Sequence, residues 1–401
     1  MTASQVEGFR TIAAVLRAAG RAAIEAENAP DKRKRLRSFS FAEAAHHLAA
    51  PVAAVRRAAA GLSTAASTLP RTRLEFAEMQ ALRPVLHGAG PGRRPELGEG
   101  LSVLAFTNFK GGSAKTTGSV HCAQYLALQG YRVLLVDLDS QGSATAQFGL
   151  DPSGDVGPDS SFAAWTAAQE DGRALDPHSL CQRTYWPGIH LVPAGAGLAA
   201  AEDSLSRRAA GPVGPALPFD ELAAFLHAVS DSYDIVVVDT RPDVNMLMTA
   251  ALHAATGLVV PTRATMTDLA STGEFFSHLA SYLSGVEDAL GQPLPICFTR
   301  ILVSAYDPAD RSQDALLTLL RDRFGPAVLP VPFLHSRVMG TAGFGKETIY
   351  EYEPSTDRAA YARVLASANA VNAAILEDIE RAWGRVPPPR SAQCGARRST
   401  S

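Results

Sequence analysis

The sequence predicts an α/β protein whose mostly parallel sheet carries helices on both faces, preceded by a small helical domain. From residue 101 onward, short apolar runs alternate with helical patterns, which is typical of parallel strands joined by crossover helices. Residues 31–90 instead hold short helix signals joined by a tight turn. A segment rich in glycine and proline separates the two parts, so we expect two domains.

Length, composition and cysteine use point to a globular protein of the cell interior. The chain has 401 residues, enough for two or three domains, with 46% hydrophobic and 19% charged residues. No apolar run reaches the roughly 18 residues of a membrane-spanning helix, and no signal peptide is visible. The four cysteines form no C-x-x-C pair, which argues against a zinc site and a disulfide framework. We expect a cytoplasmic protein.

The charge is distributed unevenly along the chain. Residues 1–95 contain 15 Lys and Arg against 7 Asp and Glu, whereas the remainder contains 22 against 33. A basic N-terminal segment followed by an acidic remainder favours contact of the N-terminal segment with nucleic acid. A solvated basic surface without a ligand is the alternative.

The first 30 residues predict one amphipathic helix. Apolar residues at helical spacing form a single stripe along residues 4–27. The stripe consists of Val6, Phe9, Ile12, Leu16 and Ala19. We interpret residues 1–30 as a dimerisation helix, with packing onto its own domain as the alternative.

Residues 31–90 predict a winged helix-turn-helix domain. Ser40 and Glu43 form a capping box that begins one helix, and Pro51 suits the first turn of a second helix over Val52–Ala60. Two short helices joined by a tight turn, with arginines on the second, are typical of a DNA-binding helix-turn-helix. The candidate DNA contacts are Arg56, Arg57, and, in a possible wing, Arg71 and Arg73. A helical dimerisation module remains the alternative.

The second domain follows a linker at residues 91–100 and extends over residues 101–385. We expect strands at 101–108, 132–137, 189–193, 234–239, 257–261, 295–303 and 328–331. Residues 151–180 are expected to form a polar insertion, and residues 357–383 a long helix that packs on the core. Residues 386–401 are expected to be disordered.

The stretch from Lys110 to Thr117 predicts a phosphate-binding turn. It reads Lys110-Gly111-Gly112-Ser113-Ala114-Lys115-Thr116-Thr117 and lies between an apolar strand and a helix. Such a turn directs backbone N–H groups and the positive end of a helix at a phosphate. Lys115 is expected to contact the β- and γ-phosphates, and the Thr116 hydroxyl to bind Mg²⁺.

This turn departs from the strict pattern G-x-x-x-x-G-K-[ST], because Phe109 and Ala114 occupy its glycine positions. It instead matches K-G-G-x-x-K-T, with Lys110 five residues before Lys115. That form resembles the ParA/MinD family of ATPases. The resemblance implies a mostly parallel P-loop NTPase sheet, ATP and Mg²⁺ as ligands, and a homodimer in which Lys110 reaches the partner's ATP.

Two apolar strands end in acids that belong with this turn. Asp137 and Asp139 follow one strand, and Asp239 ends another. Ligands of open α/β sheets bind at the carboxyl ends of the strands. An apolar strand that closes on an acid is the Walker B pattern, so Asp239 is expected to hold Mg²⁺ through water. The resemblance implies that Asp137 lies near Mg²⁺ and that Asp139 activates the water that attacks the γ-phosphorus.

Two residues depart from the family pattern. Arg241 replaces a proline in the switch loop, and Ala114 costs about 1 kcal/mol if its position requires a positive φ. We therefore expect slow ATP hydrolysis.

Other segments resemble the RepA-type partition ATPases of repABC plasmids. They are residues 124–133, 183–193 and 346–351, together with residues 37–45 in the basic domain. This resemblance implies a plasmid segregation ATPase on the nucleoid. It would bind operator DNA through the N-terminal domain and repress its own operon. The ATP-bound dimer would bind DNA non-specifically, and a ParB-type centromere-binding protein would stimulate the ATPase.

Three other functions are alternatives to plasmid segregation. A MinD-type positioning ATPase needs an amphipathic C-terminal membrane helix, which residues 387–401 do not predict. An iron–sulfur reductase needs paired cysteines, which are not visible. A repressor that binds ATP without turnover is the third, and Ala114 and Arg241 favour it.

Overall fold

The computed structural model describes residues 34–62, 72–87, 100–211, 217–335, 347–354 and 357–385, and single positions between residues 7 and 18. The expected linker at 91–100, apart from its last residue, the tail at 386–401 and Arg71 lie outside the described residues. The described positions of the first helix are helical and exposed, and they include Ile12 of the expected stripe. The dimerisation role of that helix stays a prediction.

The main domain is built on a seven-stranded sheet with the order β5-β6-β4-β7-β3-β8-β9. All neighbouring strands are parallel except the edge pair β5–β6. The strands are β3 (Ser102–Phe106), β4 (Val133–Asp137), β5 (Gln182–Arg183), β6 (Ile189–Val192), β7 (Ile235–Asp239), β8 (Gly257–Arg263) and β9 (Phe298–Ser304). The expected mostly parallel α/β sheet is confirmed.

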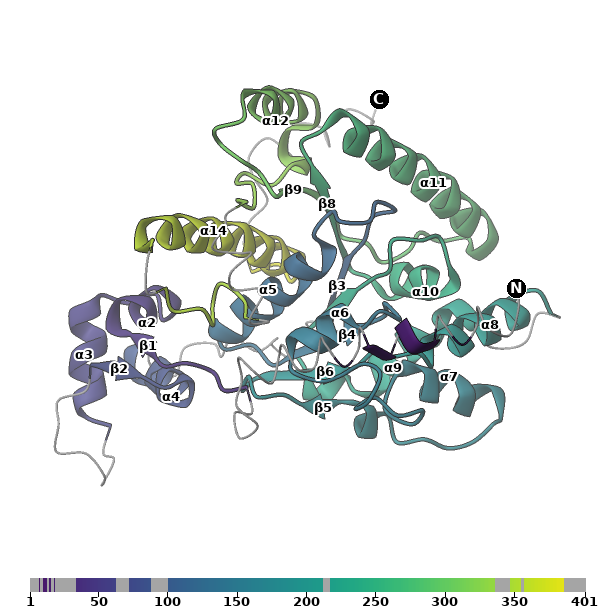
Figure 1. The fold of residues 1–401 in the computed structure, drawn as a ribbon, viewed down its shortest axis with the longest axis horizontal. Coiled ribbons are helices and arrows are strands. Elements are labelled where there is room, and N and C mark those ends of the chain that lie inside the picture. Colours follow the sequence, from purple (N-terminus) through teal and green to yellow (C-terminus); the bar gives the residue numbers. More distant parts are fainter. Residues whose placement is uncertain are drawn as a thin grey trace, which may run out of the picture.

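Helices cover both faces of this sheet (Figure 1). They are α5 (Lys115–Leu128), α6 (Ser143–Gln147), α7 (Phe162–Glu170), α8 (Leu198–Ala209), α9 (Glu221–Ala228), α10 (Met246–Ala254), α11 (Met266–Leu290), α12 (Arg311–Phe324) and α14 (Arg358–Ala382). Side chains alternate along each strand, so Leu104 and Phe106 pack with α5 and α14, while Val103 and Ala105 pack with α7 to α10. Strands buried on both faces explain the continuous apolar runs in the sequence.

The N-terminal domain contains α2 (Phe41–His47), α3 (Val52–Ala60), α4 (Phe76–His87) and a two-stranded sheet of β1 (Phe39–Ser40) and β2 (Arg73–Leu74). The capping box is present, because the Ser40 hydroxyl accepts from the Glu43 N–H and the Glu43 carboxylate accepts from the Ser40 N–H. Between α2 and α3, Ala49 has a φ of 49°. This left-handed residue turns the chain between the two helices.

The N-terminal domain packs directly on α5 and α14 (Figure 1). The His47 ring in α2 accepts a hydrogen bond from the Gln129 amide at 3.0 Å. Arg37 donates to the Tyr350 carbonyl at 2.8 Å, and Lys34 pairs with Glu351 at 2.9 Å. In addition to these polar contacts, one hydrophobic cluster contains buried side chains from both domains.

Two expectations about the main domain are wrong. Residues 328–331 form no strand, and only Val328 makes a bridge to Ile301. Pro330 and Pro332 lack the N–H groups that a further strand would donate, so pairing stops there. Residues 151–180 contain α7, which is held in the core by the buried Phe162 and Trp165.

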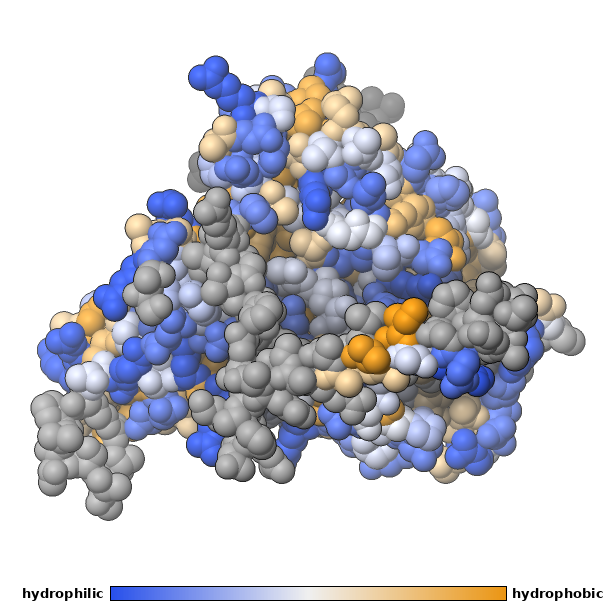
Figure 2. Space-filling view, in the orientation of Figure 1, coloured by the Kyte–Doolittle hydropathy of each residue, from blue (hydrophilic) through white to orange (hydrophobic). Residues whose placement is uncertain are grey.

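None of the helices in the described part of the chain is long and apolar enough to cross a membrane. The visible face is mostly hydrophilic, and its hydrophobic residues are scattered in small groups (Figure 2).

Candidate functional site

The expected phosphate-binding turn links the end of β3 to the start of α5. Two residues in it adopt left-handed backbone conformations, Gly112 with φ 71° and Ala114 with φ 69°. The Asn108 amide, which is fully buried, donates to the Pro261 carbonyl at 2.8 Å and accepts from the Lys110 N–H at 3.3 Å. These bonds anchor the start of the turn to β8. The sequence pattern alone indicated no role for Asn108.

Lys115 lies inside the turn. Its side chain is buried, and its amine donates to the Lys110 carbonyl at 3.0 Å. Burial lowers the pKa of Lys115 to about 8, although the carboxylates of Asp239 and Asp139 oppose that shift. A buried ammonium that has only a carbonyl as hydrogen-bond acceptor among the described residues is placed to meet an anion.

Lys110 lies outside the turn, at its rim. Its side chain is 43% exposed, and its amine lies 4.0 Å from a carboxylate oxygen of Asp268 in α11. Gly111 and Gly112 are also exposed, whereas Ser113 is buried. The two lysines therefore occupy different places, Lys115 under the loop and Lys110 half exposed at its rim.

The carboxyl edge of the sheet brings the expected acids together beside this turn. Asp137 and Asp239 are directly opposite each other in register on β4 and β7, and Phe106 is opposite Asp239 on β3. Asp137 accepts three hydrogen bonds, from the Asp139 N–H and from the N–H and hydroxyl of Thr145. Asp139 is half-buried in the loop that follows.

Asp239 differs from Asp137 in its partners. Both of its carboxylate oxygens are buried, and neither has a hydrogen-bond partner of normal geometry among the described residues. Burial, and then the charge of Asp137, raise the pKa of Asp239, while the nearby Thr116 hydroxyl and Lys115 lower it only in part. The Ser113 hydroxyl in the turn is likewise buried without a partner among those residues.

These unpartnered atoms fit a bound phosphate and a cation. Mg²⁺ prefers oxygen ligands and keeps several of its waters, so one or two carboxylates and a hydroxyl suffice. Thr116 and Asp239 offer such oxygens, and Asp137 is largely satisfied by its own hydrogen bonds. No cluster of three or more His, Cys, Asp or Glu side chains that could hold a metal ion occurs in the described part of the chain.

Glycine is required at one position of α5 that the sequence analysis did not single out. A Cβ added to Gly118 would lie 2.9 Å from the Phe106 ring. The close approach of α5 to β3 keeps the helix N-terminus against the turn.

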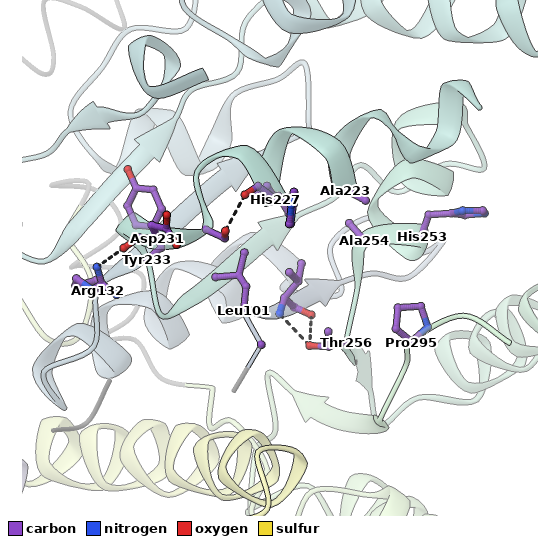
Figure 3. Close-up of a pocket in the computed structure, with 14 residues that line it drawn as sticks. Leu101, Arg132, Ala223, His227, Asp231, Tyr233, His253, Ala254, Thr256 and Pro295 are labelled. Carbon is purple, nitrogen blue, oxygen red and sulfur yellow. Dashed lines mark hydrogen bonds between the residues drawn. The ribbon is translucent and has the colours of Figure 1, made fainter. Parts of the chain in front are cut away.

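A cavity of about 550 Å³ lies at the opposite, amino edge of the sheet (Figure 3). It is lined by residues that precede or begin strands, such as Leu101, Arg132 and Thr256. Arg132 is held there by Asp234 at 2.6 Å. None of the expected site residues contributes to this cavity.

The expected DNA contacts lie in the N-terminal domain. Arg56 and Arg57 are exposed on α3, and the Arg56 guanidinium lies 5.3 Å from the centre of the Phe41 ring. Arg73 donates to the Ser38 carbonyl and hydroxyl and pairs with Glu353. Arg73 is therefore held in the contact between the two domains.

Comparison with known proteins identifies the family. A family model described as an AAA domain matches residues 101–292. The chain is 33% identical over 366 residues to "Putative replication protein A" of Rhizobium rhizogenes, covering 89% of this chain and 90% of that protein. It is 31% identical over 264 residues to the chromosome-partitioning ATPase Soj of Thermus thermophilus, covering 65% of this chain and 92% of Soj. The chain belongs to the ParA/MinD-type ATPase family.

A solved structure supports the same fold. The protein titled "Partition Protein" has a TM-score of 0.64 and 17% identity, and the match covers 94% of this chain and 99% of that one. The fold of that protein therefore matches this chain over most of its length. Its Arg241, the departure in the switch loop, is half exposed and lies 4.0 Å from Asp243.

Proposed function

We propose that this chain is a DNA-partition ATPase in which two copies enclose two molecules of ATP with Mg²⁺. The observation that carries the proposal is the separate placement of the two lysines of the turn. Lys115 is buried under the loop, and Lys110 is exposed at its rim. A lysine that is half exposed at the rim can reach a nucleotide held by a second copy.

Each residue of the site has a role in this proposal. The N–H groups from Gly111 to Thr117 and the N-terminus of α5 bind the phosphates, and Lys115 neutralises them from below. Thr116 and Asp239 would hold Mg²⁺, which supplies charge neutralisation at the transferred phosphoryl group, and Asp137 supports that edge. Asp139 orients the attacking water. Phosphoryl transfer depends mainly on positioning and electrostatic stabilisation, which these groups provide.

The experiment compares Lys110→Ala and Lys115→Ala with the unchanged chain. Isothermal titration with ATP and Mg²⁺ measures nucleotide binding, light scattering measures dimers, and phosphate release measures turnover. Lys115→Ala should lose nucleotide binding. Lys110→Ala should keep binding but lose ATP-dependent dimers. Dimers that persist in Lys110→Ala, or no ATP uptake by the unchanged chain, would contradict the proposal.

The proposal extends to DNA and a partner protein. The basic N-terminal domain would bind operator DNA through Arg56 and Arg57, and the protein would thereby repress its own operon. When ATP joins two copies, the dimer would instead bind DNA non-specifically. A ParB-type protein would stimulate hydrolysis. The exposed position of both arginines on the second helix supports the first step. Gel shifts on the DNA upstream of the coding region should weaken with Arg56→Ala and Arg57→Ala.

A repressor that binds ATP without turnover is the second candidate. Ala114 and Arg241, the two departures from the family pattern, favour it, and Ala114 has a left-handed φ of 69°. The hydrolysis assay separates the two functions. Turnover no higher than that of Lys115→Ala, with duplex DNA and partner present, would favour the repressor.

A further inference from the structure

Arg263 lies beside the phosphate-binding turn, although the sequence analysis gave it no role. It is the last residue of β8, which pairs with β3 on the side away from β7. The strand that leads into the turn and the strand that ends in Arg263 are therefore neighbours. A Cβ placed on Gly112 would lie 3.6 Å from the Arg263 guanidinium.

The guanidinium of Arg263 has no hydrogen bond or ion pair to any described residue, and the side chain is exposed. The nearby acid of α11 is already engaged. Asp268 lies 4.0 Å from Lys110 and accepts from the Thr265 hydroxyl at 2.5 Å. Three cations, Lys110, Lys115 and Arg263, thus surround one glycine turn. A guanidinium without a partner beside a phosphate-binding turn is suited to bind an anion.

We propose that Arg263 binds the terminal phosphate of ATP held in the turn of its own chain. The inference rests on the proposed function of this turn as an ATP site. The planar guanidinium presents paired N–H donors that match phosphate oxygens, which a lysine ammonium does not. Lys115 and the helix N-terminus bind the phosphates from beneath the turn, whereas Arg263 lies at the exposed rim beside Gly112, where it would meet the terminal phosphate.

This contact discriminates ATP from ADP. Hydrogen bonds to charged groups contribute about 1.5–3 kcal/mol, which corresponds to roughly 10- to 100-fold in affinity. Arg263→Ala should weaken binding of a slowly hydrolysed ATP analogue by about that factor and change ADP binding about two-fold or less. Arg263→Lys, which keeps the charge without the fork, should fall between the two.

The experiment is isothermal titration of the full-length chain with the analogue and with ADP, each with Mg²⁺. Arg323→Ala is the matched control, since Arg323 is an exposed arginine in α12 away from the turn. Circular dichroism melts confirm that each variant is folded. Equal losses for both nucleotides, or no loss for either, would overturn the proposal.

A second arm tests whether the contact lies within one chain. The same pair of titrations is run in a Lys110→Ala background, in which ATP-dependent dimers are not expected. The loss caused by Arg263→Ala should persist there. Its disappearance would show that the guanidinium serves a partner's nucleotide and would overturn the proposal. If the unchanged chain takes up neither nucleotide, the proposed function itself fails, which is a separate result.

Discussion

Ala114 shows how much conformational strain one residue places in the turn. Its φ of 69° lies in the left-handed region, where a residue with a Cβ is less stable than glycine by about 1–2 kcal/mol. Glycine loses more backbone entropy on folding, which offsets part of that gain. Ala114→Gly should therefore raise the free energy of unfolding by about 0.5–1 kcal/mol. Urea unfolding checks this value.

Ala315→Gly is the matched control for this prediction. Ala315 is exposed within α12, where a glycine costs about 1 kcal/mol. The two substitutions should thus have opposite signs. A destabilisation by Ala114→Gly as large as that by Ala315→Gly would show that the turn is not strained.

The residues of the turn were predictable from sequence because glycines, lysines and threonine occur within one short stretch. The strict pattern has a glycine at position 114, so a positive φ there was a condition that the structure had to decide, and Ala114 has a φ of 69°. Arg263 was not predictable in the same way, because it is 148 positions from Lys115 in the sequence. Its place follows only from the pairing of β8 with β3.

At the level of elements, Thr145 joins three parts of the site's edge. Its hydroxyl, at the start of α6, donates to Asp137 at the end of β4 at 2.8 Å. The same hydroxyl accepts from the Ala194 N–H, which follows β6, at 2.8 Å. All three groups are buried, so each needs its partner.

Thr145→Val should destabilise the fold by about 1–3 kcal/mol, because it leaves a buried carboxylate oxygen and a buried N–H without that partner. Thr145→Ser keeps the hydroxyl and should recover most of this loss. The midpoints of urea unfolding for the two variants provide the comparison. Equal midpoints would mean that the hydroxyl stabilises this edge no more than the methyl group that Thr145→Ser removes.

The elements themselves were predictable to different degrees. The strands that end in Asp137 and Asp239 are short, continuous apolar runs, and their length and β-branched residues favour strands over helices. Residues 328–331 were expected to form a strand because their side chains are apolar. They form none, because Pro330 and Pro332 lack the N–H groups that a strand must donate. Helix α7 was missed because the glycine, proline and charged residues around it obscured the buried Phe162 and Trp165.

At the scale of the whole molecule, the two domains are separate in sequence but not in packing. The α4 helix contacts the end of α5, where the Arg83 guanidinium donates to the Leu128 carbonyl and Gly130 has a φ of 94°. A Cβ on Gly130 would lie 2.8 Å from the Arg83 side chain. Removing residues 1–95 would therefore expose part of the core, and tests of function should use the full chain.

Two buried histidines make the stability of this joined structure depend on pH. Burial lowers the pKa of His47 to about 3, and the nearby positive charges of His46 and Arg83 add to that shift. Burial lowers the pKa of His121 to about 4. The His121 ring accepts from the Ile349 N–H through Nε2, and its Nδ1 lies 2.7 Å from the Thr117 carbonyl, so this arrangement requires the neutral ring.

Both histidines are neutral in the folded state at pH values where the unfolded chain binds protons. The unfolded pKa is about 6.5, so the unfolded chain takes up the extra protons between that value and the folded pKa. Stability is therefore complete above about pH 6.5 and decreases as the pH falls. At pH 5 each histidine should lower the free energy of unfolding by about 2 kcal/mol relative to pH 7.5.

His47→Gln tests this prediction because glutamine does not titrate and its amide oxygen can still accept from Gln129. The variant should be less stable at pH 7.5, since the ring contacts with Tyr125 and Tyr350 are lost. Between pH 7.5 and pH 5, the free energy of unfolding should nevertheless fall by about 2 kcal/mol less for the variant than for the unchanged chain. Urea unfolding at both pH values measures the difference. Parallel losses in the two proteins would show that His47 is accessible to protons in the folded state, and that the two domains are not held together around a neutral ring.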